Sequence, residues 1–263
     1  MQQTHHYLLI LQFLGFRYSG WQRQPGTKTV EGMLRKTLRF VLPGRSFKLL
    51  GAGRTDALVS AEAFAVQFML SGAALDSEPE FFSGMNRNLP PDIRLLSLQQ
   101  VPTEFNVIRD SLSKTYRYYF AFGSKPHPFC APFLGYFEGP LDMDLMKEAA
   151  GFFVGEHNFR AFIGSPSEKT RTLRHIALCH VKENRDFTAS FFPEQSYFLE
   201  VTGPGFGRYQ VRRIMAALVA LGRGTLEKEV LLDALQTGRD PGLKEIAPAS
   251  GLHLIDVRFP RKS

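Results

Sequence analysis

Hydrophobic and polar positions in the first 103 residues alternate with the periods expected of strands and helices. Short apolar runs rich in aromatic and β-branched residues predict buried strands, while Leu34 and Leu38 repeat with the spacing of one helix face. The predicted strands are residues 7–16, 47–52, 63–68 and 93–101, and the predicted helices are residues 30–40 and 78–85. This order of strand, helix, strand, strand, helix and strand is that of a ferredoxin-like domain.

The rest of the chain repeats this pattern with longer connections. Strands are predicted at residues 114–122, 172–183, 187–201 and 252–259, and helices at residues 142–152, 210–221 and 228–235. The sequence therefore predicts an α/β (α+β) protein with two ferredoxin-like halves, 1–104 and 105–263, whose sheets are mostly antiparallel. Two such halves lying side by side are expected to form one central cleft.

Charge is distributed unevenly along the 263 residues, which carry a net charge of +7. Residues 1–55 hold nine basic side chains and one acid, Glu31, whereas the remainder holds 23 basic and 24 acidic side chains. A one-sided basic field suits a polyanionic partner such as a nucleic acid, although a solvated basic surface without a partner is the alternative. The nine basic residues are Arg17, Arg23, Lys28, Arg35, Lys36, Arg39, Arg45, Lys48 and Arg54.

Several kinds of site are not indicated by the sequence. The seven histidines show no HxxxH or HExxH spacing, and no CxxC, GxxxxGK[ST] or GxSxG motif occurs, so neither a metal nor a cofactor is predicted. Cys130 and Cys179 are interpreted as two small buried hydrophobic residues of a protein from a reducing compartment. The apolar run at residues 7–14 is too short to span a bilayer, which makes the cytoplasm the expected location.

The strongest local signal for chemistry is the segment GAGRTDA at residues 51–57, which follows a predicted strand. If the strand conformation continued, Arg54 and Asp56 would lie on one face, because alternate side chains of a strand share a side. An arginine beside a carboxylate lowers the pKa of that carboxylate and keeps it ionised. The alternative is an aspartate in a turn that caps backbone groups.

This segment resembles the GRTDAGVHA motif of the TruA-like pseudouridine synthases, and further motifs of that family follow in the same order along nearly the whole chain. They are YSGWQRQ at residues 18–24, Val30-Glu31 with Leu34, NRNLP at 86–90 with Asp92-Ile93, KTYRY at 114–118, HNF at 157–159 with Phe162, Arg171-Thr172, Gly205-Phe206, VRRI at 211–214, and APASGL at 247–252.

The resemblance implies an RNA isomerase that converts uridine to pseudouridine without a cofactor, usually in the anticodon stem-loop of tRNA and usually as a homodimer. Asp56 falls on the catalytic aspartate of the family, in the first half, and Arg212 on the arginine that pairs with it, in the second. Tyr116 falls on the tyrosine that stacks on the target base, and Arg54 on an arginine that assists base flipping or binds the backbone. A phosphate contact for Arg212 and strand packing for Tyr116 remain alternatives.

The resemblance also implies that the cleft between the two halves binds RNA. Leu252 either lines the pocket or packs in the core. Basic side chains would bind RNA phosphates through charge, which carries little sequence information. The substrate-binding residues expected are Arg23, Gln24, Leu252, Arg208 and Arg213, with Arg35, Lys36 and Arg39 as further phosphate contacts.

Besides Asn158 in place of an aspartate and Gly207 in place of a bulkier residue, four positions depart from the family motifs. Leu58 replaces a glycine and Ser60 a histidine, while Asn106 and Ile108 stand where the family has His and Arg. A glycine permits a positive φ, which a leucine is expected to exclude. The changes predict retained chemistry with an altered RNA grip or RNA target. The alternative is a TruA-like protein that binds RNA without catalysis.

Overall fold

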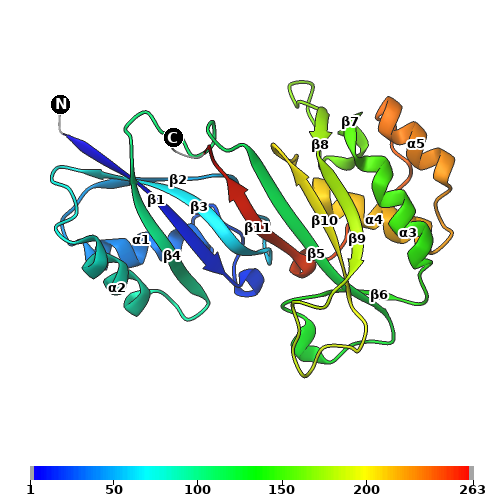
Figure 1. Cartoon of the computed structure of the whole chain (residues 1–263), viewed down its shortest axis with the longest axis horizontal. Coiled ribbons are helices and arrows are strands. Elements are labelled where there is room, and N and C mark those ends of the chain that lie inside the picture. The colour runs from blue at the N-terminus through cyan, green and yellow to red at the C-terminus, as the bar shows by residue number, and fades with distance from the viewer. Residues whose placement is uncertain (1–2, 261–263) are drawn as a thin grey trace. The chain divides into compact units, whose positions relative to one another are not determined.

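The computed structural model describes residues 3–260, which form two compact units (Figure 1). The first unit comprises residues 1–112 and 254–263, and the second comprises residues 113–253. The sequence placed the boundary near residue 104. Residues 105–112 belong to the first unit because the ring of Phe105 packs on that of Phe259 at 5.5 Å, and the N–H of Leu112 donates to the carbonyl of Arg258.

The first unit has the predicted order of strands and helices. Its strands are β1 (Thr4–Phe13), β2 (Phe47–Gly51), β3 (Ser60–Ser71) and β4 (Ile93–Val101), and its helices are α1 (Val30–Val41) and α2 (Glu78–Asn88). The strands pair antiparallel in the spatial order β4-β1-β3-β2. This arrangement confirms the ferredoxin-like fold expected for this half.

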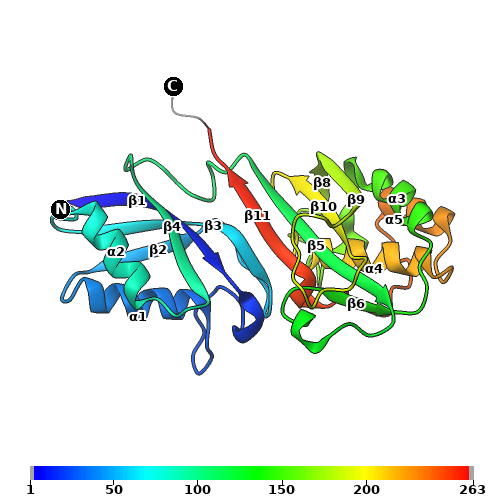
Figure 2. The same ribbon diagram turned by 60° about the horizontal axis from the view of Figure 1, so that its bottom comes forward.

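The core of the first unit lies between its sheet and its two helices (Figure 2). Alternate residues of β1 are buried, as the period of two requires, and Tyr7 of this set contacts Phe68 of β3 at 5.8 Å between ring centroids. Phe81 of α2 stacks on Phe68, also with 5.8 Å between ring centroids. Leu34 and Leu38 are fully buried on α1, as their helical spacing predicted.

The second unit repeats the theme with additional short elements. Its strands are β5 (Ser113–Gly123), β6 (Gly135–Glu138), β7 (Gly155–Asn158), β8 (Leu173–Ile176), β9 (Leu178–Glu183) and β10 (Tyr197–Gly203), and its helices are α3 (Met143–Ala150), α4 (Gln210–Gly222) and α5 (Lys228–Thr237). β10 lies between β5 and β9 and is antiparallel to both, while β6 is parallel to β5. The last strand, β11 (Leu252–Arg258), begins in the second unit and ends in the first.

Helices α3 and α4 pack against one another and against this second sheet (Figure 1). Tyr118 and Phe120 of β5 are fully buried, as are Ile214 and Leu218 of α4, which share one helix face. Cys130 and Cys179 are buried free thiols, which agrees with their interpretation as hydrophobic residues. Between residues 3 and 260, no helix is long and apolar enough to cross a membrane.

The strand predicted at residues 172–183 is wrong as one element, because it is divided at Ala177. β8 pairs with β7 in a separate two-stranded sheet, whereas β9 joins β10. The N–H of Ala177 donates to the carbonyl of Thr202 at 2.8 Å and holds the break between the two strands. Four-residue strands such as β7 carry too few positions for a recognisable alternation.

The strand predicted at residues 187–201 begins ten residues later, at Tyr197. The preceding residues form a loop because their aromatic side chains pack on one another instead of alternating across a sheet: Phe187 lies 5.5 Å from Phe192 and 5.8 Å from Phe133. The buried side chain of Asn184 closes the loop by accepting from the N–H of Phe187 and donating to Ser196.

Candidate active site

Asp56 lies in a loop between β2, which ends at Gly51, and β3, which begins at Ser60. The expected alternation of Arg54 and Asp56 along a continuing strand is therefore wrong. Asp56 is half-buried and begins a turn in which its carbonyl accepts from the N–H of Val59 at 3.3 Å, whereas Arg54 is exposed. The carboxylate of Asp56 is therefore carried by a loop and not by a strand.

The segment at residues 20–21 holds this loop in place through backbone contacts. The N–H of Trp21 donates to the carbonyl of Thr55 at 3.3 Å, and the indole ring packs on Phe64 of β3 with 4.3 Å between ring centroids. Gly20 has a φ of 90°, and a Cβ there would lie 2.4 Å from the carbonyl oxygen of Thr55. The YSGWQRQ and GRTDA motifs therefore contact one another, and together they hold the loop that carries Asp56.

Leu58 adopts the left-handed conformation that was not expected for a leucine. Its φ is 69°, and its N–H donates to the carbonyl of Tyr18 at 3.1 Å. The expectation that a leucine prevents a positive φ is therefore wrong at this position. Holding a leucine there costs about 1–2 kcal/mol, which the surrounding hydrogen bonds must offset.

Two other departures from the family motifs have local structural roles. Ser60 is buried, and its hydroxyl accepts from the N–H of Gly15 at 2.9 Å. The side chain of Asn106 accepts from the N–H groups of Ile108 and Arg109, both at 3.0 Å, and so forms a turn. Ile108 itself is exposed, and nothing in the structure explains its side chain.

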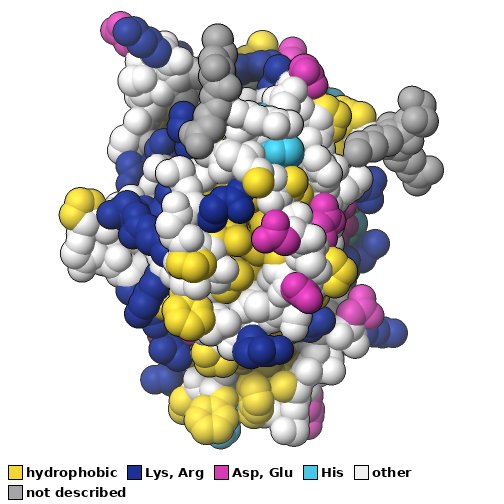
Figure 3. Space-filling model, turned by 90° about the vertical axis from the view of Figure 1, so that its left-hand side faces the viewer, with side chains coloured by type: hydrophobic (Ala, Val, Ile, Leu, Met, Phe, Trp, Pro, Cys, Tyr) yellow, Lys and Arg dark blue, Asp and Glu magenta, His cyan; other side chains and the backbone are white. Residues whose placement is uncertain are grey.

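Arg23 and Gln24 are exposed in the segment that follows Trp21. The buried carboxylate of Glu31 orders this segment, because it accepts from the N–H of Arg23 at 2.9 Å and from Nε of Arg35 at 2.7 Å. Figure 3 shows a face on which many Lys and Arg side chains gather along the left side, while Asp and Glu side chains lie mainly in the centre and on the right, where further Lys and Arg side chains also occur.

In the second unit, Tyr116 is half-buried on β5, where its ring and that of Phe206 form a T-shaped contact with 5.3 Å between centroids. Lys114 and Tyr118 share its face of the strand. Burial lowers the pKa of Lys114, so this face combines an aromatic ring with a partly desolvated cation.

Arg212 extends from the first turn of α4 and is held by a segment far along the chain. Its Nε donates to the carbonyl of Ala247 at 2.8 Å, and the N–H of Ala247 returns a bond of 3.4 Å to the Arg212 carbonyl. The neighbouring carbonyl of Pro248 accepts from the hydroxyl of Tyr118 at 2.8 Å. Ala247 and Pro248 of the APA motif, with Tyr118, therefore form a brace that holds the guanidinium of Arg212 in place.

The other predicted residues of this unit point in different directions. Arg208 is exposed, and its Nη2 donates to the hydroxyl of Tyr209 at 2.7 Å. Arg213 turns toward the carbonyl of Ala161, to which it donates at 2.8 Å. Leu252 is buried, which favours core packing over a lining role.

Sequence reasoning missed Tyr209, which directly precedes α4 and lies beside two arginines. The guanidinium carbon of Arg212 is 5.2 Å, and that of Arg208 is 4.6 Å, from the centroid of its ring. The three-residue separation of Tyr209 and Arg212 at a helix start was the one available signal.

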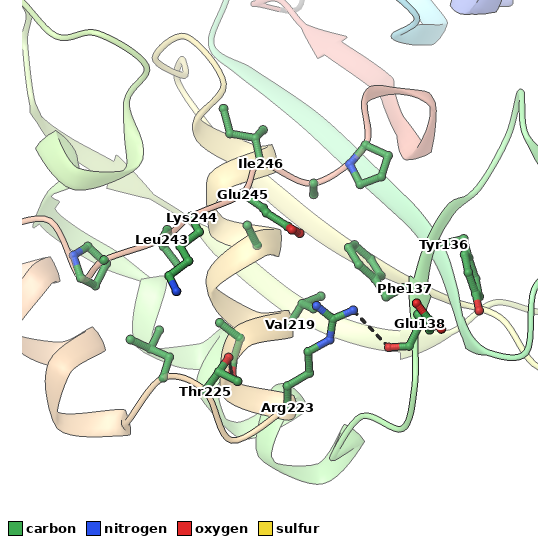
Figure 4. A pocket seen from close by; sticks show the side chains of 17 residues that line it. Tyr136, Phe137, Glu138, Val219, Arg223, Thr225, Leu243, Lys244, Glu245 and Ile246 are labelled. Atoms are coloured by element: carbon green, nitrogen blue, oxygen red, sulfur yellow. Dashed lines mark hydrogen bonds between the residues drawn. The ribbon is translucent and has the colours of Figure 1, made fainter.

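The second unit also contains a hollow of about 590 Å³ between β6, the end of α4 and residues 241–248 (Figure 4). Arg223 donates across it to the carbonyl of Glu138 at 3.1 Å. Ala247, which lines this hollow, also accepts a hydrogen bond from Arg212. In the described part of the chain, no cluster of three or more His, Cys, Asp or Glu residues has the arrangement of a metal site.

Comparison with known proteins identifies close relatives over nearly the whole chain. A family model described as tRNA pseudouridine synthase matches residues 149–260. The tRNA pseudouridine synthase A of Geotalea daltonii is 34% identical over 252 residues, which cover 95% of this chain and 98% of the relative. Proteins of the same name from Bacillus sp. and Pelobacter propionicus are 32% and 34% identical, and cover 97% and 95% of this chain and 100% and 98% of their own lengths.

Proposed function

Because this chain belongs to the tRNA pseudouridine synthase A family, we propose that it isomerises uridine to pseudouridine in tRNA, with Asp56 as the catalytic carboxylate. The observation that carries the proposal is the fixed loop at residues 52–59. Backbone hydrogen bonds from Trp21 and Leu58 tie this loop to the segment at residues 18–21, which is the second strong motif of the family. A carboxylate that must act at one atom of a nucleotide requires such a rigid support.

The reaction is balanced within one nucleotide. The bond between N1 of uracil and C1′ of ribose breaks, the base turns, and C5 bonds to C1′. The hydrogen on C5 leaves and N1 gains one, so nothing is oxidised or reduced overall. An anionic carboxylate, a cation to orient it and an aromatic surface for the displaced base are sufficient groups for this change.

We assign these roles to Asp56, Arg212 and Tyr116. Arg212 suits the role of the orienting cation because Ala247 fixes its Nε, and a guanidinium presents several donors in one plane. Tyr116 suits the stacking role because it is half-buried and its ring is held by a T-shaped contact with Phe206. Arg54 is exposed and lies two residues before Asp56, so we assign it to binding of the RNA backbone or to filling the space left by the displaced base.

RNA binding is assigned to basic and polar side chains of both units. Arg23 and Gln24 are exposed on the segment ordered by Glu31, and Arg208 is exposed at the start of α4. Arg213 is half-buried and donates to Ala161, so its contribution is to support this region as much as to bind phosphate. The assignment of Leu252 to the pocket rests only on its position in the APASGL motif.

Two observations favour catalysis over RNA binding alone. Ser60 and Asn106, which depart from the family motifs, satisfy backbone groups of their own surroundings. Their presence is therefore explained by local structure, without loss of the reaction. We also propose that the target is the anticodon stem-loop and that the working form is a homodimer. We propose the cytoplasm as the location, which the two free buried cysteines support.

The proposal is tested with tRNA transcripts that carry tritium at C5 of uridine. The wild-type protein is expected to release tritium to water, since C5 must lose its hydrogen, while Asp56→Asn is expected to release none above background. Asp76→Asn is a matched control, because Asp76 is an exposed aspartate of the same unit and should leave the rate unchanged. Equal release by wild type and Asp56→Asn would overturn the assignment of Asp56.

A further inference from the structure

Tyr209 has an unusual backbone conformation for the residue that begins a helix. Its φ is 62° and its ψ is 5°, in the left-handed region, and its side chain makes no capping hydrogen bond to α4. In the described part of the chain, Leu58 and Ser165 are the other two residues besides glycine with a positive φ. Such conformations persist where the surrounding structure holds them, and they concentrate at functional sites.

The segment that contains Gly164 holds the ring of Tyr209 in place. A Cβ on Gly164 would lie 2.4 Å from Cδ2 of Tyr209, so the ring rests directly on the backbone of this glycine. The N–H of Gly164 donates to the carbonyl of Arg208 at 2.8 Å and ties the two segments together. Because glycine is required for this approach, the ring has a defined position before any RNA is bound.

The fixed ring contacts two guanidinium groups. Arg208 lies 4.6 Å from the ring centroid and also donates to the hydroxyl at 2.7 Å. Arg212 lies 5.2 Å from the same centroid, and its Nε donates to Ala247. A guanidinium held over an aromatic face and hydrogen-bonded at Nε has little freedom to rotate about its long side chain.

We infer that Tyr209 is a positioning residue, whose ring holds the guanidinium of Arg212 in the orientation required for the isomerisation. The left-handed backbone at Tyr209 directs the ring toward Arg212, three residues along α4. Gly164 supplies the surface on which the ring rests. The inference rests on the proposed function, in which Arg212 orients the catalytic carboxylate.

Steady-state kinetics on tRNA transcripts test this inference with two substitutions. Tyr209→Asn removes the ring but suits the left-handed conformation, because asparagine tolerates a positive φ. We expect kcat to fall roughly 10- to 100-fold, the loss typical of a misplaced catalytic group, with KM within about threefold of wild type. Tyr209→Phe keeps the ring and loses only the bond to Arg208, so its kcat is expected to stay within about threefold.

A matched control comes from a second cation–ring pair in the same unit. Lys228 lies 4.8 Å from the ring centroid of Phe152, away from the residues assigned to the reaction. Phe152→Leu is expected to leave kcat unchanged. Thermal melting of each variant shows whether it folds, and Tyr209→Gly, which also suits the left-handed backbone, replaces Tyr209→Asn if the latter does not fold.

The pH dependence of kcat separates positioning from simple packing. When Arg212 is no longer held, the carboxylate that it stabilises is protonated more easily, so the acidic limb of the profile is expected to move to higher pH in Tyr209→Asn. An unchanged kcat, or a raised KM alone, would overturn the inference and assign the ring to RNA binding. Absence of product with wild type would instead refute the proposed function, and the inference with it.

Discussion

The N–H of Leu58 donates to the carbonyl of Tyr18 at 3.1 Å, and this bond closes a left-handed turn two residues after Asp56. The loop of the carboxylate and the YSGWQRQ segment are therefore connected through backbone atoms of a strained residue. Strain of this kind is stable only when the rest of the fold imposes it. Because this loop carries the proposed catalytic group, substitutions in it and in the segment bound to it test how its conformation affects stability and activity.

Leu58→Gly is expected to stabilise the protein by about 1 kcal/mol, since glycine adopts a positive φ without strain. The gain is reduced by the extra freedom of glycine in the unfolded chain and by the loss of a partly exposed side chain. Urea unfolding measures it. Leu112→Gly is the matched control: Leu112 is 58% exposed and has no positive φ, so that substitution should destabilise.

Gly20→Ala is expected to destabilise the first unit and lower the rate of the reaction. The added methyl would lie 2.4 Å from the carbonyl of Thr55, and alanine is also strained at a φ of 90°. Gly26 has a similar φ of 71° but no atom within 4 Å of an added Cβ. Gly26→Ala should therefore cost only the backbone strain, about 1 kcal/mol, and a larger loss for Gly20→Ala measures the close approach.

Tyr118→Phe is expected to weaken the brace of Arg212. It removes the hydroxyl that donates to Pro248 and leaves this carbonyl without that donor, at a cost of about 1–2 kcal/mol in the free energy of unfolding. Tyr136→Phe is the control, because its hydroxyl donates to the carbonyl of Gly123 from a half-buried position outside the brace. A fall in kcat with Tyr118→Phe alone would link the brace to the reaction.

His180 is expected to be neutral at pH 7. Burial lowers its pKa, as do Lys182 and Arg117, while Glu200 raises it. The unfolded chain therefore binds the proton first as the pH falls below about 6.5, and the free energy of unfolding decreases from there down to the lowered pKa. NMR titration of wild type and Lys182→Gln measures this, and a higher His180 pKa in the variant is the expected result.

Long elements with regular spacing could be predicted from the sequence, and their partners could not. Leu34 and Leu38 identify α1, and Thr29 begins it by accepting from the N–H of Gly32. The loop at residues 187–196 was interpreted as a strand because its phenylalanines look the same in sequence whether they pair across a sheet or pack on Phe133.

The same limit applies to the candidate site. The GRTDA motif singled out Asp56 through resemblance, but no local pattern reveals that Leu58 takes a positive φ. Tyr209 was missed because its significance depends on Gly164, a residue 45 positions earlier that only the fold brings into contact with it. Backbone strain and contacts between distant segments are properties of the folded chain, so a sequence indicates them only through motifs already known.

The most direct test is pseudouridine mapping on total tRNA treated with purified wild-type protein or with Asp56→Ala. The proposed function predicts pseudouridine at defined positions with the wild type and none of these with the variant, although the variant should still bind tRNA in a salt-sensitive manner. Binding of tRNA by both proteins, without pseudouridine from either in tRNA or any other RNA class, would contradict a catalytic role and indicate an RNA-binding protein.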